Sequence, residues 1–203
     1  IKAFFDNVNH QKLMRQLWSI GIHDKNLLCV IKKMLKAEIV MPDNSRIQPS
    51  KGTPQGGILS PLLANVVLNE LDWWISSQWE NMPCPSIKNQ INKNGTLNRG
   101  NAYKVLKKSR LKEMYIVRYA DDFKIFCRNY KDAQRTYIAV HKWLKDRLHL
   151  DISEEKSGIT NLRKRYTEFL GFKLKVKYKG VKYVVKSDMS DKAVKKQKEK
   201  LGN

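Results

Sequence analysis

The sequence predicts an α+β fold in which an antiparallel sheet has helices packed on one face. Three observations support this prediction. Several stretches carry apolar residues at every third or fourth position, as amphipathic helices do, and shorter strand-like runs lie between them. Two of those runs have turn residues at their centres, which is typical of antiparallel hairpins. With 203 residues, 41% of them hydrophobic, the chain can bury one well-packed core and a second small one.

The N-terminal part is expected to form a short strand, two helices and a hairpin. In chain order these are the strand IKAFF, the helices HQKLMRQLWSIG and DKNLLCVIKKMLKAE, and the hairpin EIVMPDNSRIQP. Gly21 is expected to end the first helix, and Asp24 is expected to cap the second. The hairpin is expected to turn at Asp43 and Asn44.

A long helix is expected after the glycine-rich stretch KGTPQGG. Ser60 is expected to cap this helix, and Pro61 fits its first turn. Apolar residues repeat every three or four positions along it, so one face should pack on the core. These residues are Leu63, Val67, Leu71 and Trp74.

The C-terminal half is expected to contain two hairpins separated by a helix over 131–148. The first hairpin is YIVRYADDFKIFC, with Ala120, Asp121 and Asp122 as its turn. The second hairpin is FKLKVKYKGVKYVVK, with its turn at Gly180. Its first strand alternates strictly between apolar residues and lysines, so one face of the hairpin should be solvent-exposed and basic. The apolar residues of that alternation are Phe172, Leu174, Val176 and Tyr178.

The charge of the chain favours a polyanionic partner. The net charge is +21, which points to nucleic acid, and a solvated lysine-rich surface is the alternative. Residues 81–113 hold eight Lys or Arg against one acidic residue and are predicted to be a long inserted loop outside the core. Residues 171–203 hold eleven Lys against three acidic residues.

Several classes of protein are disfavoured by the sequence. No apolar run approaches 18 residues and no signal-peptide pattern is present. These features predict a soluble intracellular protein without a membrane partner. Cys29, Cys84 and Cys127 are scattered and odd in number, and the four histidines show no metal-ligand spacing. A disulfide framework and a zinc site are therefore not expected.

Two adjacent aspartates interrupt the first predicted hairpin of the C-terminal half. Adjacent carboxylates destabilise each other unless a cation lies between them. Because no His or Cys is near Asp121 and Asp122, a hard ion such as Mg²⁺ or Mn²⁺ is favoured. In a basic protein such a site suggests phosphoryl transfer to a nucleic acid with two ions. The alternative is ordinary turn chemistry, because Asp favours turns.

Five motifs carry a resemblance to a known family. YADDF, preceded by GTPQGGILSPLLAN, resembles the reverse transcriptases, most closely those encoded by group II introns. IKAFFDNVNH is similar to the rest of the first palm motif of that family, and LDISEEKSGI and FLGFKL resemble its lysine-bearing and primer-grip motifs. The basic insertion before YADDF resembles one that group II intron enzymes carry and retroviral enzymes lack. The double glycine after Gln55 and the SPLLANVVLNELD helix distinguish the chain from retron-type and diversity-generating enzymes.

The resemblance implies a right-hand polymerase palm and an RNA-directed DNA polymerase with a maturase role in intron splicing. According to the resemblance, Asp121 and Asp122 bind two Mg²⁺ ions. Lys156 would neutralise or protonate the leaving pyrophosphate. A surface lysine paired with Glu154 or Glu155 is the alternative for Lys156.

The resemblance also assigns contacts with the incoming deoxynucleotide. Gln55 and Gly56 would contact the nucleotide and its templating partner, and an unremarkable loop before a helix is the alternative. The backbone at Ala3 and Phe4 would face the triphosphate. Phe5 would lie beneath the sugar, where its ring excludes a 2′-hydroxyl group. Core packing is the alternative for the two phenylalanines, which should point to opposite faces of a strand.

Further positions are implied to contact the primer and the RNA. Phe169, Leu170 and Gly171 resemble the primer grip, with an ordinary strand start as the alternative. RNA phosphates are expected at basic residues of the insertion and of the second hairpin, namely Lys104, Lys107, Lys108, Arg110, Lys112, Lys173, Lys175 and Lys177. The expected partners are intron RNA, an RNA template with a DNA or RNA primer, and dNTPs, and a homodimer is also considered. The expected location is the cytoplasm of a bacterium or an organelle.

One departure from the family pattern affects the domain expectations. In the family, a metal-binding aspartate immediately precedes the position that Ile1 occupies. The chain is therefore expected to be a palm-centred fragment with the fingers largely missing. Residues 1–186 should be the palm with part of the fingers, and 187–203 the start of the thumb. The alternatives in function are a non-catalytic intron-RNA-binding maturase and a viral-type RNA-directed RNA polymerase, which Phe5 disfavours.

Overall fold

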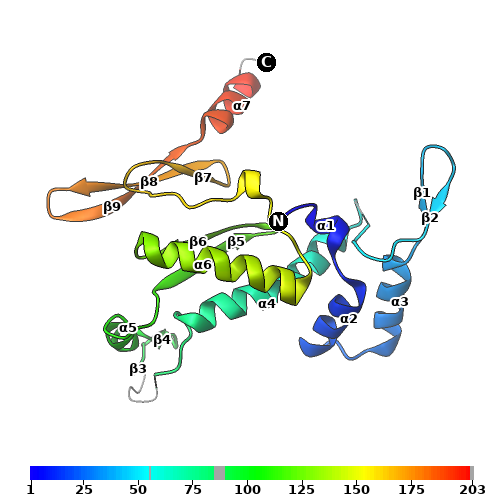
Figure 1. Ribbon diagram of the computed structural model, residues 1–203, viewed down its shortest axis with the longest axis horizontal. Coiled ribbons are helices and arrows are strands. Elements are labelled where there is room, and N and C mark those ends of the chain that lie inside the picture. Colours follow the sequence, from blue (N-terminus) through cyan, green and yellow to red (C-terminus); the bar gives the residue numbers. More distant parts are fainter. Residues whose placement is uncertain (55, 85–89, 202–203) are drawn as a thin grey trace. The chain divides into compact units, whose positions relative to one another are not determined.

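The computed structural model describes residues 1–54, 56–84 and 90–201, drawn in Figure 1. These residues form two compact units, Ile1–Ser157 and Gly158–Asn203. Both units mix helices with small antiparallel sheets, so the α+β class is confirmed. Among the described residues no helix is both long enough and apolar enough to span a lipid bilayer.

The N-terminal part of the first unit contains three helices and a hairpin. They are α1 (Phe4–Asn7), α2 (His10–Ser19), α3 (Lys25–Leu35), β1 (Ile39–Val40) and β2 (Arg46–Ile47). Gly21 follows α2 with a φ of 102°, and the Asp24 carboxylate accepts the backbone N–H groups of Asn26 and Leu27. Asn44 has a φ of 65° in the turn between β1 and β2. The two predicted helices and the predicted hairpin are confirmed here.

The strand predicted over residues 1–5 is wrong. Residues from Phe4 onward form the short helix α1. The backbone N–H groups of Gly52 and Thr53 donate to the carbonyl oxygens of Val8 and Phe5, each at 2.7 Å. These tertiary hydrogen bonds take up backbone groups that a sheet ladder would otherwise need.

The long helix α4 (Ser60–Gln78) forms the centre of the first unit. Its predicted core residues Leu63, Val67 and Leu71 are buried, whereas Trp74 is only half-buried and stacks on Trp143 at a centroid distance of 5.0 Å. Ser60 does not cap the helix as predicted, because its hydroxyl donates to the Pro54 carbonyl at 2.5 Å. Pro61 does lie in the first turn.

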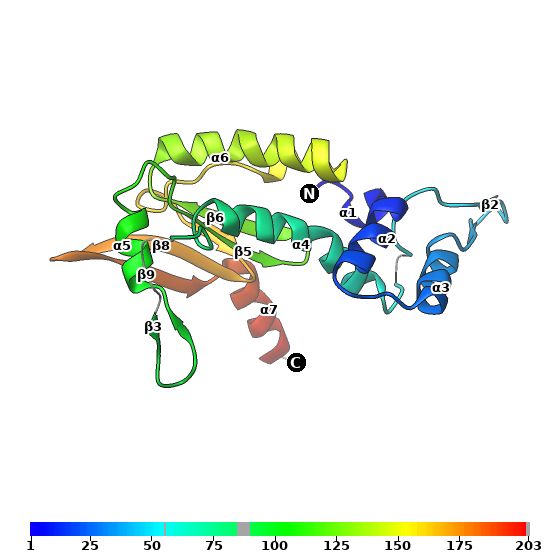
Figure 2. The same ribbon diagram turned by 90° about the horizontal axis from the view of Figure 1, so that it is seen from below.

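A hairpin and a further helix complete the core of the first unit. These are β5 (Met114–Tyr119), β6 (Asp122–Cys127) and α6 (Tyr130–Trp143), which continues as a π-helical turn to Leu148. Helix α4 packs against β5, and α6 packs against β6 (Figures 1 and 2). The predicted hairpin and the helix over 131–148 are confirmed.

The expected single sheet is not present among the described residues. Their strands form four separate antiparallel sheets, of which three are two-stranded hairpins. Hairpin pairing is local and needs only a turn, whereas joining hairpins into one sheet requires long-range strand contacts. The patterns of the sequence identified hairpins and carried no information about such joins.

The basic insertion over residues 81–113 is more ordered than predicted. It contains β3 (Gln90–Ile91), β4 (Leu97–Asn98) and the helix α5 (Gly100–Leu106). Ala102 and Leu106 lie four residues apart on α5, and both are buried. The prediction of a loop outside the core is therefore wrong for α5, whose Leu106 belongs to the main hydrophobic cluster.

The second unit contains β7 (Thr167–Phe169), β8 (Phe172–Lys179), β9 (Lys182–Met189) and α7 (Asp191–Leu201). The predicted hairpin of β8 and β9 is confirmed, and Gly180 takes a φ of 63° at its turn. The expected burial of the apolar face is only partial. Leu174 and Val176 are half-buried, whereas Phe172 and Tyr178 are exposed.

The close approach at Gly52 leads to a prediction for stability. A Cβ atom at Gly52 would lie 3.1 Å from the carbonyl oxygens of Phe5 and Asp6, and the residue has a φ of 93°. Gly52→Ala should therefore lower the free energy of unfolding by roughly 1–3 kcal/mol more than Gly21→Ala does. Gly21 has a similar φ of 102°, but among the described atoms none lies within 4 Å of its added Cβ. Urea denaturation measures both losses, and equal losses would contradict the proposed steric clash.

Candidate active site

The predicted metal-binding aspartates lie at the turn of the β5–β6 hairpin. Tyr119 pairs with Asp122 across the hairpin, so Ala120 and Asp121 form the turn and Asp122 begins β6. The predicted turn was therefore one residue too long. Asp121 is half-buried and Asp122 is exposed, and no ion pair among the described residues includes either carboxylate. Adjacent carboxylates repel each other, and a divalent ion with oxygen ligands would offset that repulsion.

Strained backbone coincides with two of the predicted site residues and with the residue before a third. Five non-glycine residues in the described part of the chain have positive φ, namely Ala3, Asn44, Ala120, His149 and Leu170. Ala3 and Leu170 are predicted triphosphate and primer-grip positions, and Ala120 directly precedes the predicted metal ligand Asp121. Left-handed conformations in such residues cost of order 1–3 kcal/mol and often mark functional sites. The coincidence supports these three positions without assigning a role to them.

The first motif and the glycine-rich stretch lie side by side. The hydrogen bonds from Gly52 and Thr53 to Val8 and Phe5 hold them together, and His10 Nε2 lies 2.7 Å from the Gly52 carbonyl oxygen. Gly56 follows with a φ of 79° and is exposed. The structure therefore brings together two segments that were predicted to contact the nucleotide. Gln55 lies outside the described residues.

The two phenylalanines of the first motif have different surroundings. Phe4 is 2% exposed and belongs to the core, whereas Phe5 is half-buried. They occupy a helical turn and not the expected strand, with ring centroids 5.4 Å apart. Phe4 is therefore a core residue, and the Phe5 ring keeps access to solvent.

The lysine-bearing motif is attached to the start of the chain. The Lys2 N–H donates to the Asp151 carbonyl at 2.8 Å, and the short 3₁₀ turn Glu154–Lys156 follows. Lys156 is exposed, and no ion pair among the described residues joins it to Glu154 or Glu155. Figures 1 and 2 show the N-terminal end of the chain at the same end of the β5–β6 hairpin as its turn.

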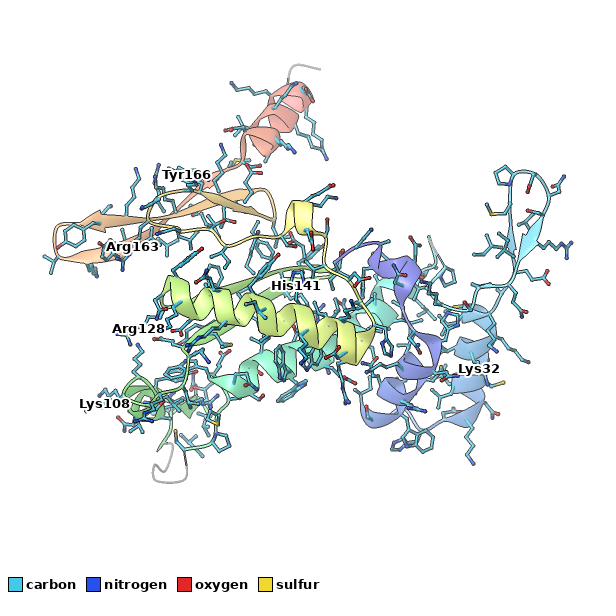
Figure 3. The ribbon with its side chains drawn as sticks, in the orientation of Figure 1. Lys32, Lys108, Arg128, His141, Arg163 and Tyr166 are labelled. Atoms are coloured by element: carbon cyan, nitrogen blue, oxygen red, sulfur yellow. The ribbon has the colours of Figure 1, made fainter. Side chains whose placement is uncertain are left out.

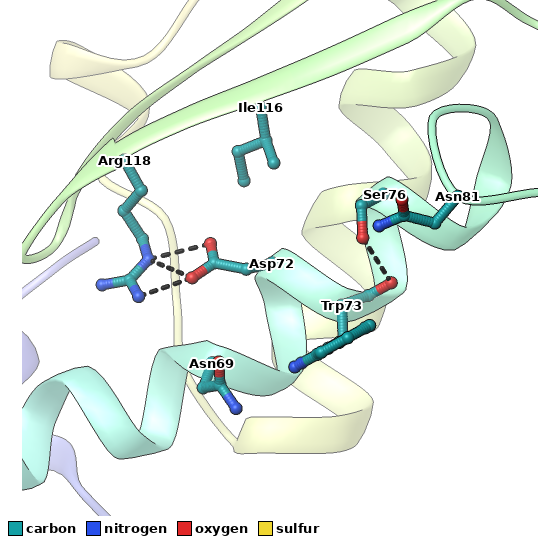
Figure 4. A pocket seen from close by; sticks show the side chains of 7 residues that line it. All are labelled: Asn69, Asp72, Trp73, Ser76, Asn81, Ile116 and Arg118. Carbon is teal, nitrogen blue, oxygen red and sulfur yellow. Dashed lines mark hydrogen bonds and ion pairs between the residues drawn. The ribbon is translucent and has the colours of Figure 1, made fainter. Parts of the chain in front are cut away.

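Sequence reasoning missed a side-chain network beside the aspartates. The Arg118 Nε donates to both Asp72 carboxylate oxygens, at 2.9 and 3.0 Å, and Nη2 donates to Oδ2 at 2.6 Å, as Figure 4 shows. Nη1 donates to Asn65 Oδ1 and to the Ala120 carbonyl, each at 2.8 Å. We call Arg118, Asp72, Asn65 and the Ala120 carbonyl the Arg118 network. It joins α4 to the turn that carries Asp121.

Two signals in the sequence point to this network. Asn65, Asn69 and Asp72 form a polar stripe at i, i+4 and i+7 on a helix in which most residues from 61 to 75 are apolar. Arg118 is the one charged residue in the strand-like run before Ala120. Neither signal identifies its partner, because the two segments are 46 residues apart in the chain.

The predicted primer-grip residues form a tight turn within the second unit. Phe169 pairs with Phe172, so Leu170 and Gly171 are the two loop residues. Their φ values are 50° and 79°, as a type I′ turn requires. The Ser190 N–H donates to the Gly171 carbonyl at 2.8 Å and ties the turn to the end of β9. The role in holding a primer stays a prediction.

The predicted RNA-binding residues differ in their availability. Lys104, Lys108 and Arg110 are exposed, whereas Lys107 lies 3.7 Å from Glu113, and Lys112 is half-buried. Figure 3 labels Lys108 on the insertion.

The three lysines predicted on β8 have different neighbours. Lys173 bonds to Asp191, and this hydrogen bond raises the pKa of Lys173. The Lys175 ammonium lies 5.1 Å from the Tyr166 ring centroid. Lys177 is exposed. The structure therefore ranks Lys177 above Lys173 and Lys175 as a phosphate contact on this strand.

The family comparison matches the motifs described above. The sequence model of the family described as reverse transcriptase (RNA-dependent DNA polymerase) matches residues 1–174. The chain therefore belongs to the reverse transcriptase family. Members of this family use divalent metal ions, and the oxygen donors of Asp121 and Asp122 fit such an ion.

The curated relatives of the chain include proteins encoded by introns. It is 32% identical to the group II intron-encoded protein LtrA of Lactococcus lactis subsp. cremoris, over 89% of the chain and 35% of LtrA. It is 29% identical to the putative COX1/OXI3 intron 2 protein of Saccharomyces cerevisiae, over 85% of the chain and 23% of that protein. It is 28% identical to protein YkfC of Escherichia coli, over 86% of the chain and 45% of YkfC. The chain thus spans less than half the length of each relative.

The left-handed Leu170 leads to a prediction for stability. Leu170→Asn should raise the free energy of unfolding by roughly 0.5–1 kcal/mol, because Asn tolerates the left-handed conformation better than Leu. Val181→Asn is the matched control, since Val181 is also an exposed apolar residue in a two-residue hairpin loop and is not among the residues with positive φ. Urea denaturation compares the two variants. An equal effect in both would show that the backbone of Leu170 is not strained.

Proposed function

We propose that this chain forms the palm of an RNA-directed DNA polymerase that belongs to a group II intron-encoded protein. The observation that supports this best is the pair of adjacent, accessible carboxylates on the strained β5–β6 turn of a chain that belongs to the reverse transcriptase family. In this proposal residues 1–186 are the palm with part of the fingers, and residues 187–203 begin the thumb.

Asp121 and Asp122 hold divalent cations in the proposed mechanism. Bound Mg²⁺ ions supply activation of the attacking hydroxyl and stabilisation of the leaving pyrophosphate. The described residues contain no cluster of three His, Cys, Asp or Glu side chains, so the two aspartates need a further ligand. In the family pattern an aspartate of the first palm motif supplies such a ligand.

The remaining site residues bind and orient the deoxynucleotide. The Phe5 ring lies beneath the sugar and excludes a 2′-hydroxyl, which selects dNTPs. Gln55 and Gly56 contact the nucleotide and its templating base, and the backbone at Ala3 and Phe4 faces the triphosphate. Lys156 is exposed and carries a positive charge that neutralises or protonates the pyrophosphate.

The proposed macromolecular partners are RNAs. They are an RNA template with a DNA or RNA primer, and the intron RNA whose splicing a maturase assists. The net charge of +21 supports phosphate binding, and Lys104, Lys108 and Arg110 offer exposed cations on the insertion. The same charge also suits the second candidate, an RNA-binding maturase without polymerase activity.

A single substitution separates these two functions. In the full-length protein, Asp121→Ala should reduce primer extension on an RNA template to background, because the proposed metal ligand is lost. RNA affinity should stay within a few fold. Asp43→Ala is the control, since Asp43 is a turn aspartate whose carboxylate accepts from Ser45. Extension by Asp121→Ala at the rate of the control would contradict the assignment of Asp121 as a metal ligand, whereas no extension by the unmodified protein would leave only the non-catalytic maturase.

A second prediction concerns the RNA-binding surface. Replacing Lys104, Lys108 and Arg110 with Gln should lower the slope of log affinity against log salt by about 0.7–0.9 for each lost phosphate contact. The control replaces Lys32, Lys33 and Lys36 of the α3 end, which match the first set in charge and exposure; Figure 3 labels Lys32 and Lys108 on their separate elements. Filter binding to intron RNA over a salt series measures both slopes. Equal slopes in the two triple variants would show a general charge effect and no specific role of the insertion.

A further inference from the structure

We infer that Arg118 is a positioning residue that sets the orientation of the turn peptide between Ala120 and Asp121, and through it the metal-binding carboxylate. The inference rests on the proposed function, since it assigns to Arg118 a positioning role in the same metal site. It starts from the Arg118 network, which connects α4 to the turn by hydrogen bonds of 2.6–3.0 Å.

The first step concerns the strain at the turn. Ala120 has a φ of 52°, a conformation that costs an L-residue roughly 1–2 kcal/mol. Such a conformation persists only where its surroundings hold it. The Ala120 carbonyl accepts a hydrogen bond from the charged guanidinium of Arg118, and charge-assisted bonds are about twice as strong as neutral ones. Since this carbonyl belongs to the peptide that leads into Asp121, the bond fixes the direction in which Asp121 leaves the turn.

The second step concerns what holds Arg118 itself. Its side chain is 12% exposed and forms a bidentate pair with Asp72, Nε to Oδ1 and Nη2 to Oδ2, and the Asp72 side chain is 32% exposed. Asn65 accepts from the same Nη1 that serves Ala120. Asn65 and Asp72 lie two turns apart on α4, so the helix presents two acceptors to one planar group. Hydrogen bonds to the core helix α4 therefore fix the position of the turn at the end of the hairpin.

The third step concerns residue type. A guanidinium is a planar fork that can serve acceptors on several sides at once, whereas the lysine ammonium is a single point charge. Arg118→Lys can keep an ion pair with Asp72, but it cannot also serve Asn65 and Ala120 in the observed geometry. The substitution therefore preserves the charge of the site and removes the link to the turn.

The test measures metal binding and catalysis separately. Binding of Mn²⁺ to the full-length protein is followed by electron paramagnetic resonance, and the Mg²⁺ dependence of primer extension is measured beside it. Arg118→Lys should raise the half-saturating concentration of both ions at least about tenfold, as loss of a group that orients a metal ligand does. Extra Mg²⁺ should restore most of the extension rate. Asn65→Ala should raise the same concentration by a smaller factor, because it removes one acceptor of Nη1.

Matched controls exclude a general effect on folding. Arg147→Lys makes the same change in an ion pair to the same helix, since Arg147 Nε lies 3.2 Å from the Glu70 carboxylate, and it should leave ion dependence unchanged. If Arg118→Lys lowers the thermal midpoint but leaves both ion dependences unchanged, Arg118 is only structural and the inference is wrong. The proposed function fails separately, if the unmodified full-length protein extends no primer on an RNA template.

Discussion

The first unit depends on the burial of one side of α4. Leu68, Leu71 and Ile75 are fully buried there, and each such side chain contributes roughly 1.5–3 kcal/mol relative to an exposed position. Helix α2 and strand β5 both pack on this helix. Because the same helix carries Asn65 and Asp72 at the edge of its apolar face, the packing that stabilises the unit also places the acceptors that hold Arg118.

The candidate site combines strained backbone with groups that hold it in place. Ala120 is left-handed and its carbonyl is bonded by Arg118. Gly52 is left-handed and is bonded on both sides, through its N–H to Val8 and through its carbonyl to His10. In both places two chain segments from different parts of the sequence meet. The left-handed conformation is costly for Ala120, whereas glycine adopts a positive φ at Gly52 without a steric penalty. The strain energy at Ala120 is small beside the burial of α4, so the core can support it.

Local structure was largely predictable from the sequence. Asp24 as a helix cap, Gly21 after a helix and Gly180 in a hairpin turn each act on residues within a few positions, and all three lie as expected. The strand over residues 1–5 was predicted wrongly because the Phe5 carbonyl bonds to Thr53 and the Lys2 N–H bonds to Asp151, and no local pattern reports those distant partners. Helix α5 was missed for a different reason. It has seven residues, too few for an apolar period to be visible.

The predicted site residues were found through motifs, whereas the side chains that orient them were not. Adjacent aspartates can be recognised in the amino-acid sequence, but the pairing of Arg118 with Asp72 forms only when β5 packs on α4 in the folded chain. That pairing also bears on the charge of the site. Arg118 is three residues from Asp121 in a chain of net charge +21, and a free guanidinium there would compete with a metal ion for the carboxylates. Asp72 offsets the charge of Arg118 within the network, so the arginine can bond the Ala120 carbonyl without neutralising the aspartates that follow.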